Sequence, residues 1–147
     1  MRVGDVMTVR AARIRYSSNM LYAAEIVGLS GIGDLMVVDD DNTFIGVLSE
    51  GDILRTALPD IDEILAAGGT VREALDVFLR KGEALANTPI APVVIQNPIV
   101  VSPDEEVAAV TTILLQKHIG RLPVVVDGKL VGTVSRADIC RAVVGTL

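Results

Sequence analysis

The hydrophobic and polar positions of this chain follow one pattern twice. An apolar run with helical spacing over residues 20–29 is followed by two short apolar runs on either side of an acidic turn. The same order returns as a helical run over 107–115 and short apolar runs over 122–126 and 130–135, which flank Asp127-Gly128. Helical spacing predicts helices, and an Asp-Gly pair between strand-like runs predicts a tight hairpin. Each unit is therefore predicted to run strand, helix, strand, strand, helix.

The two units are most alike at a segment that runs from a predicted strand into a predicted helix. Residues 45–55 recur as residues 131–141, and both copies contain the pattern Gly-x-x-Ser-x-x-Asp. The repetition predicts two structurally equivalent sites in one small protein. The motif residues are Gly46, Ser49 and Asp52 in the first unit and Gly132, Ser135 and Asp138 in the second.

Two interpretations of the Ser-x-x-Asp pattern are open. A Ser followed three residues later by an acidic residue is typical of a helix start, where each side chain satisfies a backbone N–H. The preceding Gly favours a second role, because Gly within a strand costs stability and often marks a group that closely approaches the backbone. The N–H groups and dipole at such a helix start also suit a phosphate. The motif therefore predicts either a helix cap alone or a ligand site.

The second helix shows a start signal in the sequence. Ser102-Pro103-Asp104-Glu105 offers an N-cap Ser, a Pro at the first helical position and a Glu that closes a capping box. We therefore expect this helix to begin immediately after Ser102.

Residues 59–92 form an insertion between the units. Capping signals begin at Asp60 and Thr70, and Gly82 is a predicted helix stop. We expect one or two helices whose apolar face is buried against the repeats or against a partner subunit. That face includes Val71, Leu75 and Phe78.

Length and composition limit the possible functions. The chain has 147 residues and a formal net charge of −6, with only 3% aromatic residues. It can form one domain or two half-domains with a shared core. The charge disfavours nucleic acid and anionic membranes, and few aromatic side chains are present to stack on bases. No apolar run reaches the roughly 18 residues of a membrane span, and no secretory signal is seen, so we expect no membrane insertion and a cytoplasmic location.

The sequence gives no sign of an enzyme or a metal site. It lacks a Gly-Lys-Ser/Thr phosphate loop, a Gly-x-Gly-x-x-Gly turn and a Cys/His nucleophile pair. It has one His and one Cys, and the acidic turn at residues 39–42 lacks the ligand spacing of a calcium loop. We therefore expect no catalytic activity, no metal and no cofactor. Cys140 lies among apolar neighbours and is predicted to be a buried small hydrophobe.

The motif residues resemble those of a known family. The stretch Leu122-Pro123-Val124-Val125, followed by residues 131–138, resembles the CBS domain, named after cystathionine beta-synthase. Two copies resemble the tandem pair called a Bateman module, and the likeness covers nearly the whole chain outside the insertion. It implies an α+β fold in which two β-α-β-β-α repeats form a pseudo-twofold pair. The expected boundaries are 1–58 for the first repeat, 59–92 for the helical insertion and 93–147 for the second repeat.

The resemblance also implies two clefts for adenosine-containing ligands, such as AMP, ADP, ATP or S-adenosylmethionine. In such modules the motif Asp accepts hydrogen bonds from the ribose, while the Ser and a basic residue before Leu-Pro contact phosphate. The opposite repeat supplies an apolar pocket for adenine. One cleft would contain Asp138, Ser135 and Arg121, with Asp5, Val6, Arg10 to Ala12, Ile32 and Gly33 from the first repeat. The mirror cleft would contain Asp52 and Ser49, with Val93, Val94, Ile119 and Gly120.

Charge distinguishes the two expected clefts. Where the second unit has Arg121 and Arg136, the first has Asp34 and Glu50. Each reversed charge a few ångströms from a phosphate is worth on the order of 1 to 4 kcal/mol. We therefore predict that the Asp138 cleft is the better nucleotide site, and that the mirror cleft takes nucleosides, zwitterions or nothing.

The resemblance implies a regulatory function. We expect a module that binds an adenosine-containing ligand between its repeats and signals to a protein partner that the sequence does not identify. Modules of this family commonly pair, so a homodimer is expected. The alternative is a constitutive homodimeric scaffold with vestigial clefts.

Overall fold

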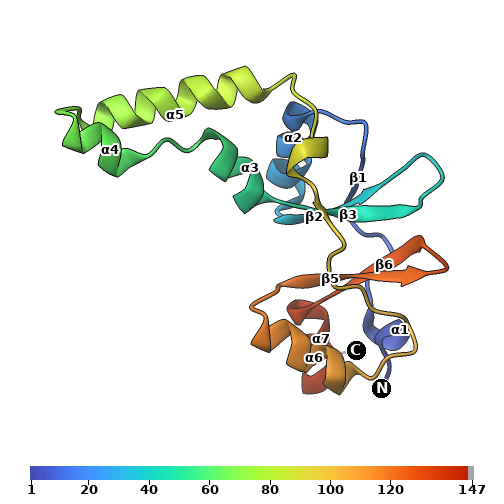
Figure 1. Cartoon of the computed structure of the whole chain (residues 1–147). Helices are drawn as coiled ribbons and strands as arrows, with labels where there is room; N and C mark the ends of the chain where they lie inside the picture. The colour runs from blue at the N-terminus through green and yellow to red at the C-terminus, as the bar shows by residue number, and fades with distance from the viewer. Residues whose placement is uncertain (146–147) are drawn as a thin grey trace.

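The computed structural model describes residues 1–145 and has the α+β fold that the repeats predict (Figure 1). Each unit runs strand, helix, strand, strand, helix, although the first strand of the second unit is reduced to a single bridge at Val101. The first repeat contains β1 (Arg13–Arg15), α2 (Met20–Ser30), β2 (Asp34–Val38), β3 (Phe44–Ser49) and α3 (Glu50–Ala57). The second contains α6 (Val107–Gln116), β5 (Arg121–Val126), β6 (Lys129–Ser135) and α7 (Arg136–Val144). The remaining elements are α1 (Val3–Val6), α4 (Ile61–Ala66), α5 (Val71–Leu85), the 3₁₀ turn η1 (Ala91–Val93) and β4 (Ile95–Gln96).

The two sheets have the same order of strands. In the first repeat the order is β1-β2-β3-β4, with β1 parallel to β2 and the other pairs antiparallel. In the second repeat β5 and β6 pair antiparallel. Val101 bridges Val124 in parallel on one side, and Thr8 bridges Thr133 antiparallel on the other. Val101 thus takes the place of β1, and Thr8 takes the place of β4.

Each repeat completes its core with the segment that precedes the other repeat. Val3 and Val6 of α1 are buried in the core of the second repeat. Ile90 and Val94, from the segment before the second repeat, are buried in the core of the first. Between the sheets a third buried cluster contains Met36 of β2 together with Val38 and Leu130. Because cores are shared in this way, neither repeat has a complete core of its own.

The motif glycines are required by this exchange of segments. A Cβ atom on Gly46 would overlap the carbonyl oxygen of Ile95, and a Cβ on Gly132 would lie 2.6 Å from the carbonyl oxygen of Thr8. The close approach predicted from the sequence is confirmed, but the approaching group is the backbone of the protein. The hairpin at Asp127 and Gly128 is also confirmed, because both residues have positive φ, as a type I′ turn requires.

The start of α6 was predicted wrongly. The helix begins at Val107, and residues 102–106 form a turn in which the Glu105 carboxylate accepts the N–H of Ser102 at 2.6 Å. The carbonyls of Pro103 and Glu105 accept N–H groups from α1 at 2.9 Å. The segment is held out of the helix because it binds the N-terminal residues of the chain.

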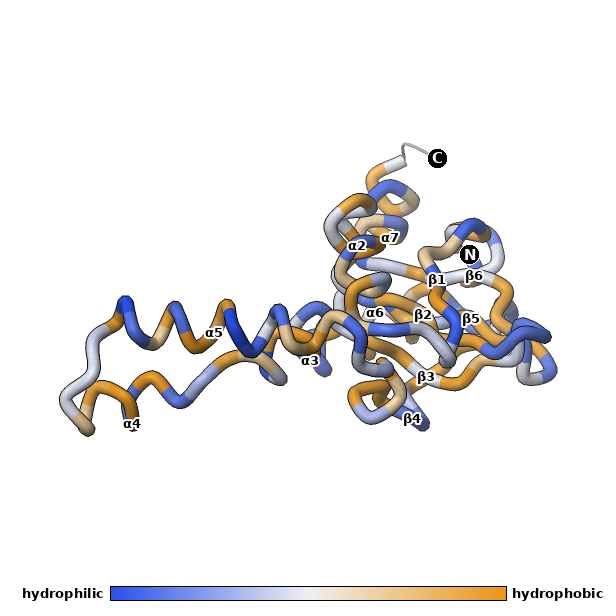
Figure 2. The backbone as a smooth tube through the Cα atoms, turned by 90° about the horizontal axis from the view of Figure 1, so that it is seen from above, coloured by the Kyte–Doolittle hydropathy of each residue, from blue (hydrophilic) through white to orange (hydrophobic). Residues whose placement is uncertain are grey.

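The insertion forms a helical hairpin, α4 and α5, that projects away from both repeats (Figures 1 and 2). Asp60 and Thr70 are its N-caps, as predicted. The stop predicted at Gly82 is wrong, since α5 continues to Leu85, which packs against the core of the first repeat. That packing outweighs the cost of one interior Gly, about 1 kcal/mol.

Two predictions of burial are not met in the single chain. On the apolar face of α5, Val71 is 67% and Leu75 53% exposed, whereas Phe78, nearer the first repeat, is half-buried. Cys140 is also exposed, because it lies on the outer face of α7. The helices of the single chain therefore expose large apolar side chains to solvent.

Candidate functional site

Both Ser-x-x-Asp motifs cap a helix. Ser49 ends β3, and its Oγ accepts the N–H of Asp52 at 3.1 Å, while the same hydroxyl donates to Asp52 Oδ2 at 2.7 Å. Ser135 caps α7 in the same way, with the N–H of Asp138 at 3.1 Å. The capping interpretation is thus confirmed for both copies. A ligand role requires open space beside the carboxylate, and the two motifs differ in this respect.

A cavity of about 250 Å³ lies beside the first motif, between the two repeats. The first repeat contributes Asp34, Ser49 and Asp52, and the second contributes His118, Ile119, Gly120 and Arg121. The segment that joins them contributes Ile95, Pro98 and Ile99. The lining therefore combines two carboxylates and one guanidinium with an apolar wall of isoleucines.

The structure brings together most of the residues assigned to the mirror cleft. Ser49, Asp52, Ile119 and Gly120 share the cavity, as the sequence predicted. Val94 does not line it, because its side chain is buried against Gly46 in the core of the first repeat. The apolar wall missed from the sequence is formed instead by Ile95, Pro98 and Ile99. Ile95 follows Val94 directly, but the register of the short β4 could not be assigned from the sequence, and Pro98 and Ile99 lie beyond it.

The residues assigned to the other cleft are dispersed. Arg121 lines the cavity beside Asp52 and donates from Nη1 to Thr133 Oγ1 at 2.8 Å. Val6 is buried in the core of the second repeat, and Ala12 packs against the core of the first. Ile32 and Gly33 are half-buried, and neither lines the cavity at Asp52.

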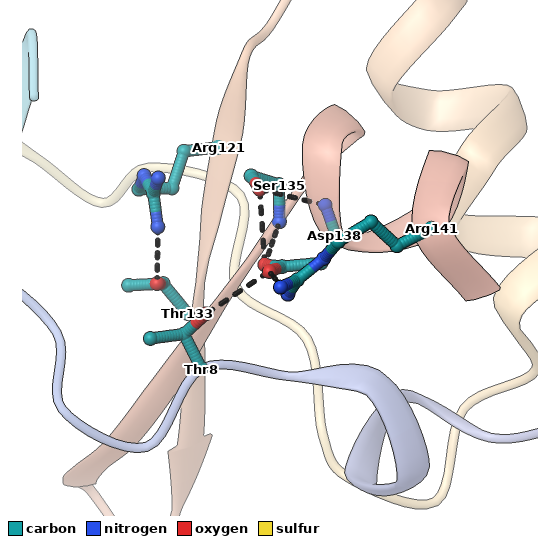
Figure 3. A network of polar contacts seen from close by, with 6 residues as sticks. All are labelled: Thr8, Arg121, Thr133, Ser135, Asp138 and Arg141. Carbon is teal, nitrogen blue, oxygen red and sulfur yellow. Dashed lines mark hydrogen bonds and ion pairs between the residues drawn. The ribbon is translucent and has the colours of Figure 1, made fainter. Parts of the chain in front are cut away.

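The Asp138 carboxylate is enclosed by hydrogen-bond donors from the protein (Figure 3). Its Oδ1 accepts the Thr8 hydroxyl at 3.0 Å and Arg141 Nη2 at 3.1 Å. Its Oδ2 accepts both the N–H and the hydroxyl of Ser135, each at 2.9 Å. Four donors fill the roughly four acceptor positions of a carboxylate. Asp138 therefore has no acceptor position left for a ligand in this arrangement.

The Asp52 carboxylate is more open. It accepts hydrogen bonds from the Ser49 hydroxyl and from Arg55 Nη2, the latter at 2.6 Å. Its side chain is 14% exposed, compared with 6% for Asp138. Part of the difference comes from the strand alongside, because Ile95 pairs with β3 where Thr8 bridges β6. Ile95 has no hydroxyl, so Asp52 receives no hydrogen bond corresponding to that from Thr8.

The basic residues of the second repeat also bind to the protein. Arg136 donates from Nε to the Ile119 carbonyl and from Nη2 to the Leu114 carbonyl, both at 2.9 Å. These carbonyls lie at the end of α6, where a cation also favours the helix dipole. Arg136 is thus engaged with the C-terminal end of α6.

The two acidic residues of the cavity differ in pKa. Burial raises the pKa of Asp34, and the nearby Glu50 and Asp52 carboxylates raise it further, against an opposing effect of Arg121. Burial also raises the pKa of Asp52, but hydrogen bonds from Ser49 and Arg55 bring it below the ordinary value. Asp52 is therefore a stable anionic acceptor, whereas Asp34 lies in a more negative environment.

Residues 1–145 were compared with the requirements of a metal site and of a membrane-spanning helix. No three His, Cys, Asp or Glu side chains in that range are grouped so that they could hold a metal ion. In the same range, no helix has the length and apolar character needed to cross a membrane.

Relatives of known structure share this fold. The CBSX2 protein of Arabidopsis thaliana is 28% identical, with a TM-score of 0.77 over 99% of this chain and 95% of that one. A second structure, described as CBSX2 in complex with AMP, is 26% identical with a TM-score of 0.75 over 99% and 97% of the two chains. The CBS domain pair of protein MJ0100 has the same fold, with 22% identity and a TM-score of 0.68 over 100% and 98%.

Curated relatives are longer than this chain. The chloroplastic CBSX2 of Arabidopsis thaliana is 28% identical over 95% of this chain, which spans 62% of that protein. The uncharacterized protein MJ1225 of Methanocaldococcus jannaschii is 24% identical over 92% of this chain, which spans 40% of that protein.

The family itself is identified from both repeats. The CBS domain matches residues 3–58 and again residues 90–145, on either side of the helical hairpin. The two matches contain both motifs and both exchanged segments. This chain belongs to the CBS domain family and carries a tandem pair of CBS repeats.

Proposed function

We propose that this protein is a regulatory module that binds an adenosine-containing ligand in the cavity at Asp52 and signals occupancy to a protein partner. One observation carries the proposal. The Asp52 carboxylate borders a cavity whose opposite wall belongs to the other repeat, whereas the Asp138 carboxylate is surrounded by donors of its own chain.

The lining of the cavity suits a nucleoside. Asp52 can accept hydrogen bonds from the two ribose hydroxyls, because an ionised carboxylate is an acceptor only. Ile95, Ile99 and Ile119 offer apolar surface to a base, and Gly120 lets a ligand approach the backbone closely. A few polar groups in a mainly apolar pocket are typical of small-molecule sites. The CBSX2 relative described in complex with AMP supports the adenosine class.

The proposal moves the favoured site from Asp138 to Asp52. The sequence prediction relied on Arg121 and Arg136, but Arg136 binds the end of α6 and Arg121 borders the Asp52 cavity. A ligand at Asp138 would have to displace at least one of the four donors that the carboxylate accepts, which include Thr8 and Arg141.

Signalling would follow from the position of the cavity between the repeats. A ligand that contacts both Asp52 and Ile119 changes the free energy of their relative placement, and a coupling of about 1 to 3 kcal/mol is sufficient for regulation. The segment from Ile95 to Ile99 connects the cavity wall to α5 through η1. The projecting hairpin is thus a route by which occupancy could reach a partner.

Titration calorimetry with adenosine, AMP, ATP and S-adenosylmethionine tests the proposal. We expect binding to the natural chain, loss of binding in Asp52→Ala, and little change in Asp138→Asn. Asp138→Asn is the matched control because it keeps the size of the side chain at the equivalent motif position. Binding lost in Asp138→Asn but retained in Asp52→Ala would reject the proposed site.

A constitutive homodimeric scaffold is the second candidate function. It is favoured by apolar side chains exposed on the helices, such as Leu29 at 91% and Val144 at 78%. Thermal unfolding distinguishes the two functions, since a ligand at about 100 times its dissociation constant adds roughly 2.7 kcal/mol of stability. No shift with any adenosine compound, together with a dimer by light scattering, would favour the scaffold.

A further inference from the structure

We propose that the Asp52 cavity prefers adenosine ligands that carry a positive or zwitterionic group over those that carry phosphate. This inference rests on the proposed function, because it concerns the charge of the ligand in the same cavity. It follows from the acidic residues that surround the cavity and from the interactions of the nearby cations.

Three carboxylates lie at or beside the cavity. Asp34 and Asp52 line it directly, and Asp34 Oδ2 lies 4.0 Å from the position of a Cβ atom on Gly120, in the opposite wall. Glu50 lies outside the lining, with its Oε1 3.0 Å from the corresponding Cβ position on Gly33, but its charge acts on Asp34. The pKa of Asp34 is raised mainly by burial, and the charges of Glu50 and Asp52 raise it further against the opposing effect of Arg121.

The nearby cations are already engaged. Arg55 donates to Asp52 at 2.6 Å, and Arg121 donates to Thr133 Oγ1 at 2.8 Å while its charge offsets that of Asp34. His118 also lines the cavity. Among the residues that line the cavity, two carboxylates, Asp34 and Asp52, therefore face one guanidinium, that of Arg121, and the balance of these groups is negative.

The equivalent positions of the second repeat have the opposite sign. Asp34 begins β2 where Arg121 begins β5, and Glu50 begins α3 where Arg136 begins α7. The backbone geometry is the same in both, since the N–H of Glu50 donates to the Gly33 carbonyl and the N–H of Arg136 donates to the Gly120 carbonyl. The difference between the two sides is thus one of charge on a shared backbone.

A ligand charge several ångströms from these carboxylates changes the affinity by about tenfold per unit charge at the effective dielectric of a protein surface. S-adenosylmethionine and S-adenosylhomocysteine form a matched pair of probes, because they differ in a positive sulfonium and a neutral thioether. Adenosine and AMP form the second pair, which differ in a phosphate.

Calorimetry with these four compounds, at low salt and pH 7.5, tests the inference. We expect S-adenosylmethionine to bind about tenfold more tightly than S-adenosylhomocysteine, and AMP to bind more weakly than adenosine. Asp34→Asn should reduce both differences by several-fold, and Glu50→Gln should reduce them less. Asp76→Asn, on the exposed face of α5, is the control and should leave both differences unchanged.

The results separate this inference from the proposed function. AMP tighter than adenosine, or differences unchanged in both Asp34→Asn and Glu50→Gln, would overturn the charge preference while adenosine binding still supports the site. Binding of none of the four compounds, or binding that survives Asp52→Ala, would overturn both.

Discussion

The two Ser-x-x-Asp motifs of this chain have the same backbone and different surroundings. Each Ser caps a helix, and each motif Gly makes room for a segment that crosses from the other repeat. At Asp138 the crossing segment places Thr8 on the carboxylate, whereas at Asp52 it places Ile95 beside a cavity. A hydroxyl on the crossing segment thus occupies the carboxylate of one motif, and its absence leaves the carboxylate of the other beside the cavity in which we propose that a ligand binds.

The largest effect on stability is expected from adding a side chain where the two exchanged segments pass the motif glycines, Gly46 and Gly132. Gly46→Ala should destabilise the protein by about 3 kcal/mol, because its Cβ would overlap the carbonyl of Ile95, a backbone atom that cannot move away alone. Gly132→Ala should cost somewhat less, since the Thr8 carbonyl is farther from the corresponding Cβ position. Urea unfolding measures both.

Gly28→Ala is the control for this pair. Gly28 lies within α2 with no atom within 4 Å of its Cβ position, so Ala there should stabilise the protein by up to about 1 kcal/mol. Equal effects of Ala at all three positions would show that the crossings are not tightly packed.

The next largest effect is a difference between the two motif aspartates, one of which should matter more for stability and the other for binding. Asp138→Ala should cost about 2 to 3 kcal/mol of unfolding free energy, because it leaves Thr8 and Ser135 without their buried acceptor. Asp52→Ala should cost about 1 kcal/mol or less and should abolish binding instead. Urea unfolding and titration calorimetry on the same preparations measure both effects. An Asp138→Ala chain that keeps its stability but no longer binds adenosine would contradict this prediction.

A smaller effect is expected from substituting Thr8, which faces Asp138, and Ile95, which lies at the cavity of Asp52. Thr8→Val removes one hydrogen bond to Asp138 and should cost about 1 kcal/mol. Ile95→Thr places a hydroxyl beside Asp52 and should weaken adenosine binding by several-fold, because it competes for the carboxylate. Ile95→Val, which adds no donor, is the control, and an equal loss of affinity in both variants would contradict this explanation.

The smallest effect is a difference in pH dependence between the two carboxyls of the cavity. The raised pKa of Asp34 means that its contribution to stability is greatest at acid pH and is lost as the pH rises through that pKa. The lowered pKa of Asp52 has the opposite sign, so its contribution is present above the ordinary value and is lost as the pH falls through the folded pKa.

Urea unfolding at several pH values, on the natural chain and on Asp34→Asn and Asp52→Asn, measures these contributions. The stability of Asp34→Asn relative to the natural chain should increase from acid to neutral pH. The stability of Asp52→Asn relative to the natural chain should decrease over the same range. Parallel curves for both variants would contradict the assigned pKa directions.

The sequence predicted the repeated fold because its signals are local. The Asp127-Gly128 turn, the Ser49 and Ser135 caps and the helical spacing of residues 107–115 each depend on neighbours within a few residues. The predictions were wrong where distant segments intervene. Residues 102–106 bind α1 and stay outside the helix, and packing of Leu85 carries α5 past Gly82.

The candidate site shows the same limit. Ser49, Asp52, Ile119 and Gly120 could be placed together from the repeat and the family resemblance. The contact between Thr8 and Asp138 spans 130 positions and depends on the exchange of segments, so spacing alone could not reveal it. For that reason the sequence prediction named the Asp138 cleft as the better site, whereas we propose the Asp52 cavity.

Adenosine titration of Asp52→Ala and Asp138→Asn tests the central claim most directly, because the two variants alter equivalent positions of the repeats. The account predicts that adenosine affinity falls at least tenfold in Asp52→Ala and changes less than about twofold in Asp138→Asn. Unchanged affinity in Asp52→Ala, with loss in Asp138→Asn, would contradict it.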